Sequence, residues 1–280
     1  MHWQTTRFRI SLARPLVMGI VNVTPDSFSD GGNFALTDTA IRHCDRLTSD
    51  GADVLDIGGE STRPGAVPCS LEVELGRVIP VLKHALTLGL PVSIDTSRPE
   101  VMRCALGLGV DIINDVRALQ QPGALQALAA SSSAGVCLMH MRGEPGTMQD
   151  EPDYADVVAD VAAFLQGRIQ AVLAAGVAFD RIVVDPGIGF GKAADHNWTL
   201  LRRQAELLRL GCPLLVGWSR KSPLGRLTGR PVADRQAASV AAALASVQRG
   251  AAVVRVHDVA ATVDAIKVWQ MAGLWPPVGR

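Results

Sequence analysis

The sequence has little that would suit a nucleic-acid-binding, secreted or membrane protein. Lys plus Arg and Asp plus Glu both total 27, so no basic excess is present to bind nucleic acid. The N-terminal residues lack the continuous apolar core of a signal peptide, and no segment approaches roughly 18 uninterrupted apolar residues. We therefore expect a cytoplasmic protein with small-molecule partners, without nucleic acid or membrane.

The cysteines and histidines also lack the spacings of metal or redox motifs. The five cysteines are scattered without a C-x-x-C pair, which suits buried, reduced thiols in the cytosol. His140 and His257 are single histidines without an H-x-H or H-E-x-x-H partner. We therefore expect no zinc site. His257 fits a phosphate contact, whereas His140 is left unassigned, with a supporting hydrogen-bonding role as the alternative.

Eight short apolar runs are present, and helix-like segments separate them. Most runs are continuous rather than alternating, as in parallel strands covered on both faces. Eight such alternations over 280 residues predict a single-domain α/β fold over residues 1–280, the (β/α)8 TIM barrel. An open sheet would carry a glycine-rich dinucleotide loop after its first strand, and none follows Asn22. The predicted strands are Val17–Asn22, Val54–Gly58, Val92–Asp95, Asp111–Asp115, Val136–His140, Ile182–Asp185, Leu214–Gly217 and Val253–Val256.

Local signals refine this arrangement. Residues 1–14 precede the first strand and are expected to cap the bottom of the barrel. Ser97–Glu100 predicts a capping box before a helix over 101–108. Gly176, Gly211 and Gly250 are expected to end helices, and Trp275-Pro-Pro to end the last one. Residues 143–154 are interpreted as a rim loop.

Polar residues occur at or just after nearly every strand end, where barrel enzymes place their active sites. A single Asp or Asn there is often only a turn former or helix cap, but a set of eight favours a site. Lys221, Arg255 and His257 follow the last two strands, where many barrels bind phosphate. A solvated turn is the alternative for Ser219–Ser222, with Arg220 pointing to solvent. The set is Asn22, Asp56, Asp95, Asn114, His140, Asp185, Lys221 and Arg255.

Three further features concern the ligand. Asp185 ends a buried strand and needs a partner, either a ligand's amino-pyrimidine edge or Lys221. Gly187–Lys192 fits neither nucleotide motif; its glycines suit close approach to a flat ligand beside Phe190, and an ordinary turn is equally compatible. Gly58–Gly65 is long enough for a loop that covers substrate through Thr62 and Arg63, with a plain surface loop as the alternative.

Four segments closely resemble the dihydropteroate synthase family, and the likeness runs from about the first strand to Asp258. They are Met18–Gly32, Gly58–Gly65, Asp185–Lys192 and Ser219–Lys221. The resemblance implies a (β/α)8 barrel that condenses a dihydropterin-methyl diphosphate with p-aminobenzoate, releasing diphosphate and giving dihydropteroate in folate synthesis. It also implies a homodimer, for which the Ala-rich segment Ala237–Ala245 permits close helix packing.

The resemblance also implies residue roles. Asp95, Asp185 and Lys221 would be catalytic, in a dissociative, SN1-like reaction without a covalent enzyme intermediate. Mg²⁺ would be bound partly by Asn22, with diphosphate oxygens and water completing its shell. Loops 26–34 and 60–66 would close over the diphosphate, so that pterin binds first. Pterin and diphosphate would contact Thr62, Asp95, Asn114, Asp185, Lys221, Arg255 and His257, and p-aminobenzoate, with competing sulfonamides, Phe28, Arg63, Pro64, Phe190 and Ser219.

Two other functions remain open at this point. A catalytically silent pterin-binding paralogue would keep Asp185, Asn114 and Lys221 but lose diphosphate groups; here Asn22 and Arg255 are both present, which disfavours it. A pterin-dependent methyltransferase would need neither a diphosphate site nor a carboxylate site for the amine substrate.

Overall fold

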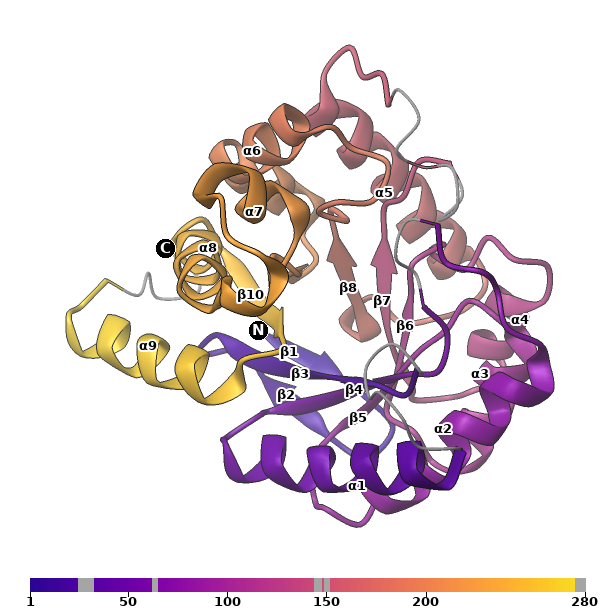
Figure 1. Ribbon diagram of the computed structural model, residues 1–280. Helices are drawn as coiled ribbons and strands as arrows, with labels where there is room; N and C mark the ends of the chain where they lie inside the picture. The colour runs from indigo at the N-terminus through magenta and orange to yellow at the C-terminus, as the bar shows by residue number, and fades with distance from the viewer. Residues whose placement is uncertain (25–32, 62–64, 144–147, 149–151, 275–280) are drawn as a thin grey trace.

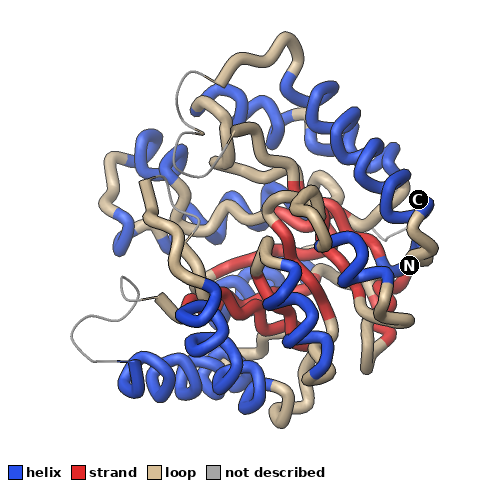
Figure 2. Tube along the Cα trace, turned by 90° about the vertical axis from the view of Figure 1, so that its right-hand side faces the viewer, coloured by secondary structure: helices blue, strands red, loops and turns tan. Residues whose placement is uncertain are grey.

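The computed structural model describes residues 1–24, 33–61, 65–143, 148 and 152–274. Eight parallel strands form a closed barrel in the order β10-β3-β4-β5-β6-β7-β8-β9, and helices surround it (Figures 1 and 2). The predicted TIM barrel is therefore confirmed. Its strands are β3 Leu16–Asn22, β4 Val54–Gly58, β5 Val92–Asp95, β6 Ile112–Asp115, β7 Gly135–Met139, β8 Ile182–Asp185, β9 Leu214–Val216 and β10 Ala251–Val256.

Every barrel strand is followed by helix. The α-helices are α1 Asn33–Ser49, α2 Leu71–Ala85, α3 Pro99–Gly107, α4 Ala124–Ala129, α5 Val157–Ala174, α6 Ala194–Arg202, α7 Ser222–Thr228, α8 Gln236–Gln248 and α9 Val259–Met271. Short 3₁₀ turns lie at Phe179–Arg181, Gln204–Leu210 and Val232–Asp234. Gly176, Gly211 and Gly250 have positive φ just beyond helices or a 3₁₀ turn, as predicted.

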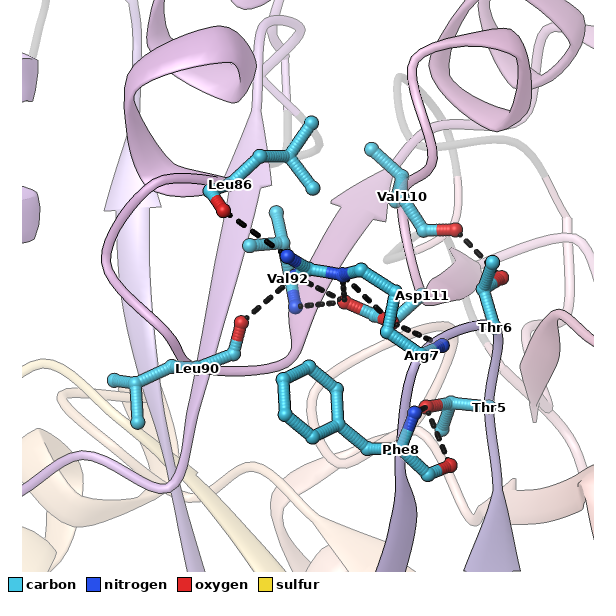
Figure 3. Close-up of polar contacts among 9 residues, drawn as sticks. All are labelled: Thr5, Thr6, Arg7, Phe8, Leu86, Leu90, Val92, Val110 and Asp111. Atoms are coloured by element: carbon cyan, nitrogen blue, oxygen red, sulfur yellow. Dashed lines mark hydrogen bonds and ion pairs between the residues drawn. The ribbon is translucent and has the colours of Figure 1, made fainter.

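The N-terminal residues close the bottom of the barrel, as expected. A hairpin of β1 (His2–Gln4) and β2 (Arg9–Ser11) places Trp3 in the cluster that fills the barrel interior. Between these strands, Arg7 lies across the loops before β5 and β6, where its Nη2 is 2.6 Å from Asp111 Oδ2 (Figure 3). Asp111 is fully buried and also accepts hydrogen bonds from the Arg7 and Val92 backbone N–H groups. These contacts hold the N-terminal hairpin, which forms the plug at the bottom of the barrel, against the barrel wall.

The most apolar helix is part of the barrel wall. α5 is long and apolar enough to span a membrane by length and composition alone, with a hydropathy of 1.4 over 18 residues. Asp160 and Arg168 interrupt its apolar sequence. Its buried side chains, including Val158, Val161 and Leu165, recur at helical spacing and join the main hydrophobic cluster. We therefore interpret α5 as a core helix.

Two local predictions were wrong. Ser97 does not cap α3: the N-cap is Arg98, whose φ and ψ of −90° and 120° are those favoured before a proline, here Pro99. The Ser97 hydroxyl instead donates to Asp115 Oδ1 at 2.6 Å. All five cysteines are free thiols, but Cys104 is exposed and Cys69 only half-buried. The predicted helix stop at Trp275 lies outside the described residues.

Candidate active site

The barrel register brings the polar strand ends into one row. Asn22 pairs with Gly58, Gly58 with Asp95, and Asp95 with Asn114. Paired residues of parallel strands face the same side of a sheet, so these side chains share the interior face at the C-terminal mouth. Asp185, at the end of β8, pairs with Met139 of the neighbouring strand β7. The strand-end residues Asn22, Asp95, Asn114 and Asp185 therefore gather at the mouth, whereas the His140 ring packs edge-on against Phe164 of α5, outside the barrel.

A buried network of charges forms the floor of this mouth. Arg255 Nε lies 2.6 Å from Asp56 Oδ2, and Arg255 Nη2 lies 2.7 Å from Asp95 Oδ2. Asn114 Nδ2 donates to Asp56 Oδ2 at 3.1 Å. Burial alone would lower the pKa of Arg255, but the two carboxylates outweigh it and raise that pKa. Within the described residues, Asp56 Oδ1 has no hydrogen-bond partner although it is buried, so the floor can accept one more donor.

The acids of this network are unusually weak. Burial raises the pKa of Asp95 to about 7; Arg255 opposes the shift, and Asp56 adds to it. Burial likewise raises the pKa of Asp185 to about 6, against the hydrogen bond from the Gly187 N–H and the charge of Lys221. Perturbed carboxyls in a cleft are typical of functional sites.

The loop after β8 packs tightly beside Asp185. The Gly187 N–H donates to Asp185 Oδ1 at 2.7 Å, which supplies the partner that this carboxylate needed. A Cβ at Gly187, whose φ is +68°, would lie 1.9 Å from the His140 carbonyl oxygen, so only glycine fits. The Phe190 ring faces Lys221, with Nζ 4.1 Å from its centroid. Close approach to the His140 and Arg142 carbonyl oxygens explains Gly187 and Gly191, whereas the predicted approach to a flat ligand stays a prediction.

The loops after β9 and β10 are joined by Ser219. Its hydroxyl oxygen lies 2.9 Å from His257 Nδ1 and accepts from the His257 N–H at 3.1 Å. Burial, reinforced by Arg255, lowers the pKa of His257 to about 3, so the ligand-free imidazole is neutral. Arg220 does not point freely to solvent, because it pairs with Asp258 at 2.7 Å.

The sequence interpretation missed Lys192, which it used only to reject a nucleotide motif. Lys192 is 2% exposed, and its Nζ lies 2.9 Å from Nδ1 of the unassigned His140. The available sequence signal was a lysine at the end of a glycine-rich run that directly follows a buried strand. The contact with His140 spans 52 residues, so residue spacing could not predict it.

Four predicted ligand contacts cannot be placed. Phe28, Thr62, Arg63 and Pro64 lie outside the described residues. A cavity of about 580 Å³ opens beside Asp95, lined by residues of the loops after β4, β5 and β6, and such a volume suits a small molecule. Among the described residues, no three His, Cys, Asp or Glu side chains gather as metal ligands, and Asn22 ends β3 half-buried.

Comparison with known proteins shows which family the chain resembles. The family model described as "Pterin binding enzyme" matches residues 18–257. The dihydropteroate synthase of Neisseria meningitidis serogroup B is 54% identical, over 97% of this chain and 98% of that protein. The solved synthase of Xanthomonas albilineans with 4-aminobenzoic acid has a TM-score of 0.92 and 51% identity, covering 99% and 100% of the two chains. That of Burkholderia cenocepacia with 7,8-dihydropteroate has a TM-score of 0.88 and 52% identity, covering 97% and 96%.

Proposed function

Since the chain belongs to the dihydropteroate synthase family of pterin-binding enzymes, we infer that it makes 7,8-dihydropteroate for folate biosynthesis. It is a transferase that condenses 6-hydroxymethyl-7,8-dihydropterin diphosphate with p-aminobenzoate and releases diphosphate. The observation that carries this assignment to the residues is the buried Asp185 carboxylate near the charge of Lys221, at the same mouth of the barrel as Asn114.

Pterin recognition follows from the chemistry of these groups. A pterin edge carries amino and ring N–H donors next to a carbonyl acceptor. Asp185 accepts from the donors, the Asn114 amide both donates and accepts, and the Lys221 ammonium donates to the carbonyl. The unpartnered Asp56 Oδ1 offers a further acceptor in the same floor.

The diphosphate is assigned to Arg255, His257 and Thr62. Arg255 uses Nε and Nη2 on carboxylates, so its contact with the diphosphate is through the remainder of its guanidinium. The Asn22 amide oxygen would serve as one hard ligand of a magnesium ion bound with the diphosphate, and that ion would supply charge neutralisation of the leaving group.

The chemical step is dissociative. The methylene C–O bond breaks and its electron pair leaves with the diphosphate, giving a pterin-methyl cation. Asp95 stabilises this cation electrostatically. Because a neighbouring cation lowers a carboxyl pKa, charge developing on the methylene also favours the ionised form of Asp95, whose pKa is about 7 without ligand. The aromatic amine then forms the C–N bond and loses its proton.

The second substrate needs positioning rather than activation, because an aromatic amine is already nucleophilic at neutral pH. We assign its carboxylate to Ser219 and Arg63, and its ring to Phe28, Pro64 and Phe190. Sulfonamides, which carry the same 4-aminophenyl group, compete there. Loops 26–34 and 60–66, which lie partly outside the described residues, would close over the diphosphate, so that pterin binds first.

Two further assignments rest on the family and the exposed surface. We place the enzyme in the cytoplasm, in keeping with its free thiols. We also assign it as a homodimer, as the resemblance to the family implies; Leu227 of α7 and Val268 of α9 are 69% and 70% exposed and are available to an interface. Light scattering on the purified protein tests this assignment directly.

The deciding experiment is diphosphate release from the pterin diphosphate, with and without p-aminobenzoate and Mg²⁺, in wild type and Asp185→Asn. Turnover that depends on the amine and the ion, and is lost in the variant, establishes the synthase. Pterin binding without turnover would instead indicate a silent paralogue. Turnover with a methyl donor and no diphosphate requirement would indicate a methyltransferase.

A further inference from the structure

Lys192 is a buried ammonium with an unusual set of partners. Its Nζ lies 2.9 Å from His140 Nδ1, 2.9 Å from the Gly187 carbonyl oxygen and 2.9 Å from that of Phe190, with the His140 carbonyl oxygen at 3.3 Å. These four partners are neutral acceptors. A buried charge held only by neutral groups contributes little to the stability of a fold. The arrangement of these acceptors around Lys192 is therefore better explained by a function than by a contribution to stability.

Two of the acceptors belong to the wall of the substrate site. Gly187 is held on both sides, because its N–H donates to Asp185 while its carbonyl accepts from Lys192. Phe190 is held in the same way, because its ring faces Lys221 while its carbonyl accepts from Lys192. Lys192 thus donates to Gly187, the hydrogen-bond partner of the pterin residue Asp185, and to Phe190, whose ring faces the pterin residue Lys221.

The other two acceptors belong to the end of β7. His140 supplies both its Nδ1 and its carbonyl oxygen, and that carbonyl is the atom against which Gly187 packs. The ammonium therefore joins the β8 loop to β7 at the point of closest backbone approach. Other ties hold the outside of the loop: Asn197 accepts from the Gly189 N–H at 2.7 Å, and Tyr154 donates to the Gly191 carbonyl at 2.8 Å.

We propose that Lys192 is a positioning residue of the pterin site, whose ammonium, with neutral His140 as partner, holds residues 187–190 in the conformation that presents Asp185 and Phe190 to the ligand. Nothing in the reaction requires Lys192 to touch substrate. The identity of the ligand in this inference rests on the proposed function, whereas the effect of Lys192 on the loop does not.

The titration behaviour of both partners agrees with this arrangement. Burial, and then the charge of Lys192, lower the pKa of His140 to about 3, so its imidazole stays neutral with its proton on Nε2 and accepts at Nδ1. Burial lowers the pKa of Lys192 to about 7; Asp185 opposes the shift, and Lys221 adds to it. The ammonium, which has three N–H donors for these acceptors, therefore loses a proton as the pH rises above neutral, and the neutral amine keeps two donors. Arg142 is the other charge that acts on His140.

The test compares Lys192→Met with Asp111→Asn, a variant that weakens the ion pair at the opposite end of the barrel. Steady-state kinetics gives KM for the pterin diphosphate and kcat, and hydrogen–deuterium exchange of the ligand-free protein follows residues 186–192. We expect Lys192→Met to raise KM about tenfold or more with kcat kept within about threefold, and to speed exchange of this segment. Asp111→Asn should change neither the KM for the pterin diphosphate nor the exchange of residues 186–192. Lys192→Gln, which keeps two donors, should fall between Met and wild type, and serves if the Met variant does not fold.

Other outcomes would overturn the proposal. Unchanged KM and exchange in Lys192→Met would make the residue a passive part of the core. Equal effects in Asp111→Asn would assign them to general destabilisation, and a fall in kcat at unchanged KM would place Lys192 in the chemical step. If the wild type made no dihydropteroate, the proposed function would fail, whereas the exchange comparison would still decide the role of Lys192.

Discussion

Replacing Asp185 by Asn should make the ligand-free enzyme more stable while removing its activity. The Asp185 carboxylate is 6% exposed, and burial raises its pKa to about 6. Asparagine has nearly the same shape and keeps an oxygen for the Gly187 N–H, but carries no charge to bury. The substitution therefore removes an electrostatic cost and keeps the local hydrogen bond.

The size of the effect follows from the pKa. Moving a carboxyl pKa from 3.8 in the unfolded chain to about 6 in the folded protein costs about 3 kcal/mol when the group is ionised. The folded state holds its proton more tightly, so this cost is complete above about pH 6 and disappears as the pH falls toward 3.8. For a domain of this size, it corresponds to a rise in Tm of about 5 °C at neutral pH.

Thermal unfolding of both proteins between pH 4 and pH 8 measures this difference. The variant should melt higher at pH 7.5, and the two curves should converge near pH 4. Asp111→Asn is the matched control, because Asp111 is also buried but pairs with Arg7, so its loss should lower Tm instead. A variant of Asp185 that melts below wild type at pH 7.5, or a difference independent of pH, would refute the reasoning.

Three further predictions concern other parts of the site. Arg255→Leu leaves the buried Asp56 carboxylate without its cation and should lower the free energy of unfolding by about 3 to 5 kcal/mol, measured by urea denaturation. Gly187→Ala forces a Cβ against the His140 carbonyl and should lose about 2 to 4 kcal/mol together with pterin affinity, whereas Gly176→Ala, with similar φ but open space, should lose only about 1 kcal/mol. Calorimetry should find p-aminobenzoate binding only after pterin diphosphate or diphosphate is added, and tight binding of the amine alone would contradict ordered addition.

The strands of this barrel could be predicted closely because most are largely apolar runs with a polar residue at or just after their end. The predicted bounds of β4, β5 and β8 are those of the structure. The Ser97 cap failed because two local preferences compete there, and the conformation required before Pro99 moved the helix start by one residue. Local patterns therefore decide element positions except where neighbouring signals conflict.

The membership of the site was predictable, whereas its internal contacts were not. Strand-end polarity identified Asp95, Asn114 and Asp185, because the C-terminal mouth of a barrel collects such residues. The pairing of Arg255 with Asp56 spans 199 residues and depends on barrel closure and register. The contact of Lys192 with His140 could not be predicted for the same reason, because only the fold brings the two residues together.

The two ends of the barrel use buried charge in opposite ways. At the bottom, Asp111 receives an ion pair and two backbone N–H groups, so its charge is fully compensated and holds the N-terminal plug in place. At the mouth, burial raises the pKa of both Asp95 and Asp185, and Asp56 keeps an oxygen without a partner in the described part of the chain. These acids become fully compensated only when a ligand supplies N–H donors or positive charge. The stability that the mouth lacks without ligand is thus available as binding energy for the pterin and for the cation formed from it.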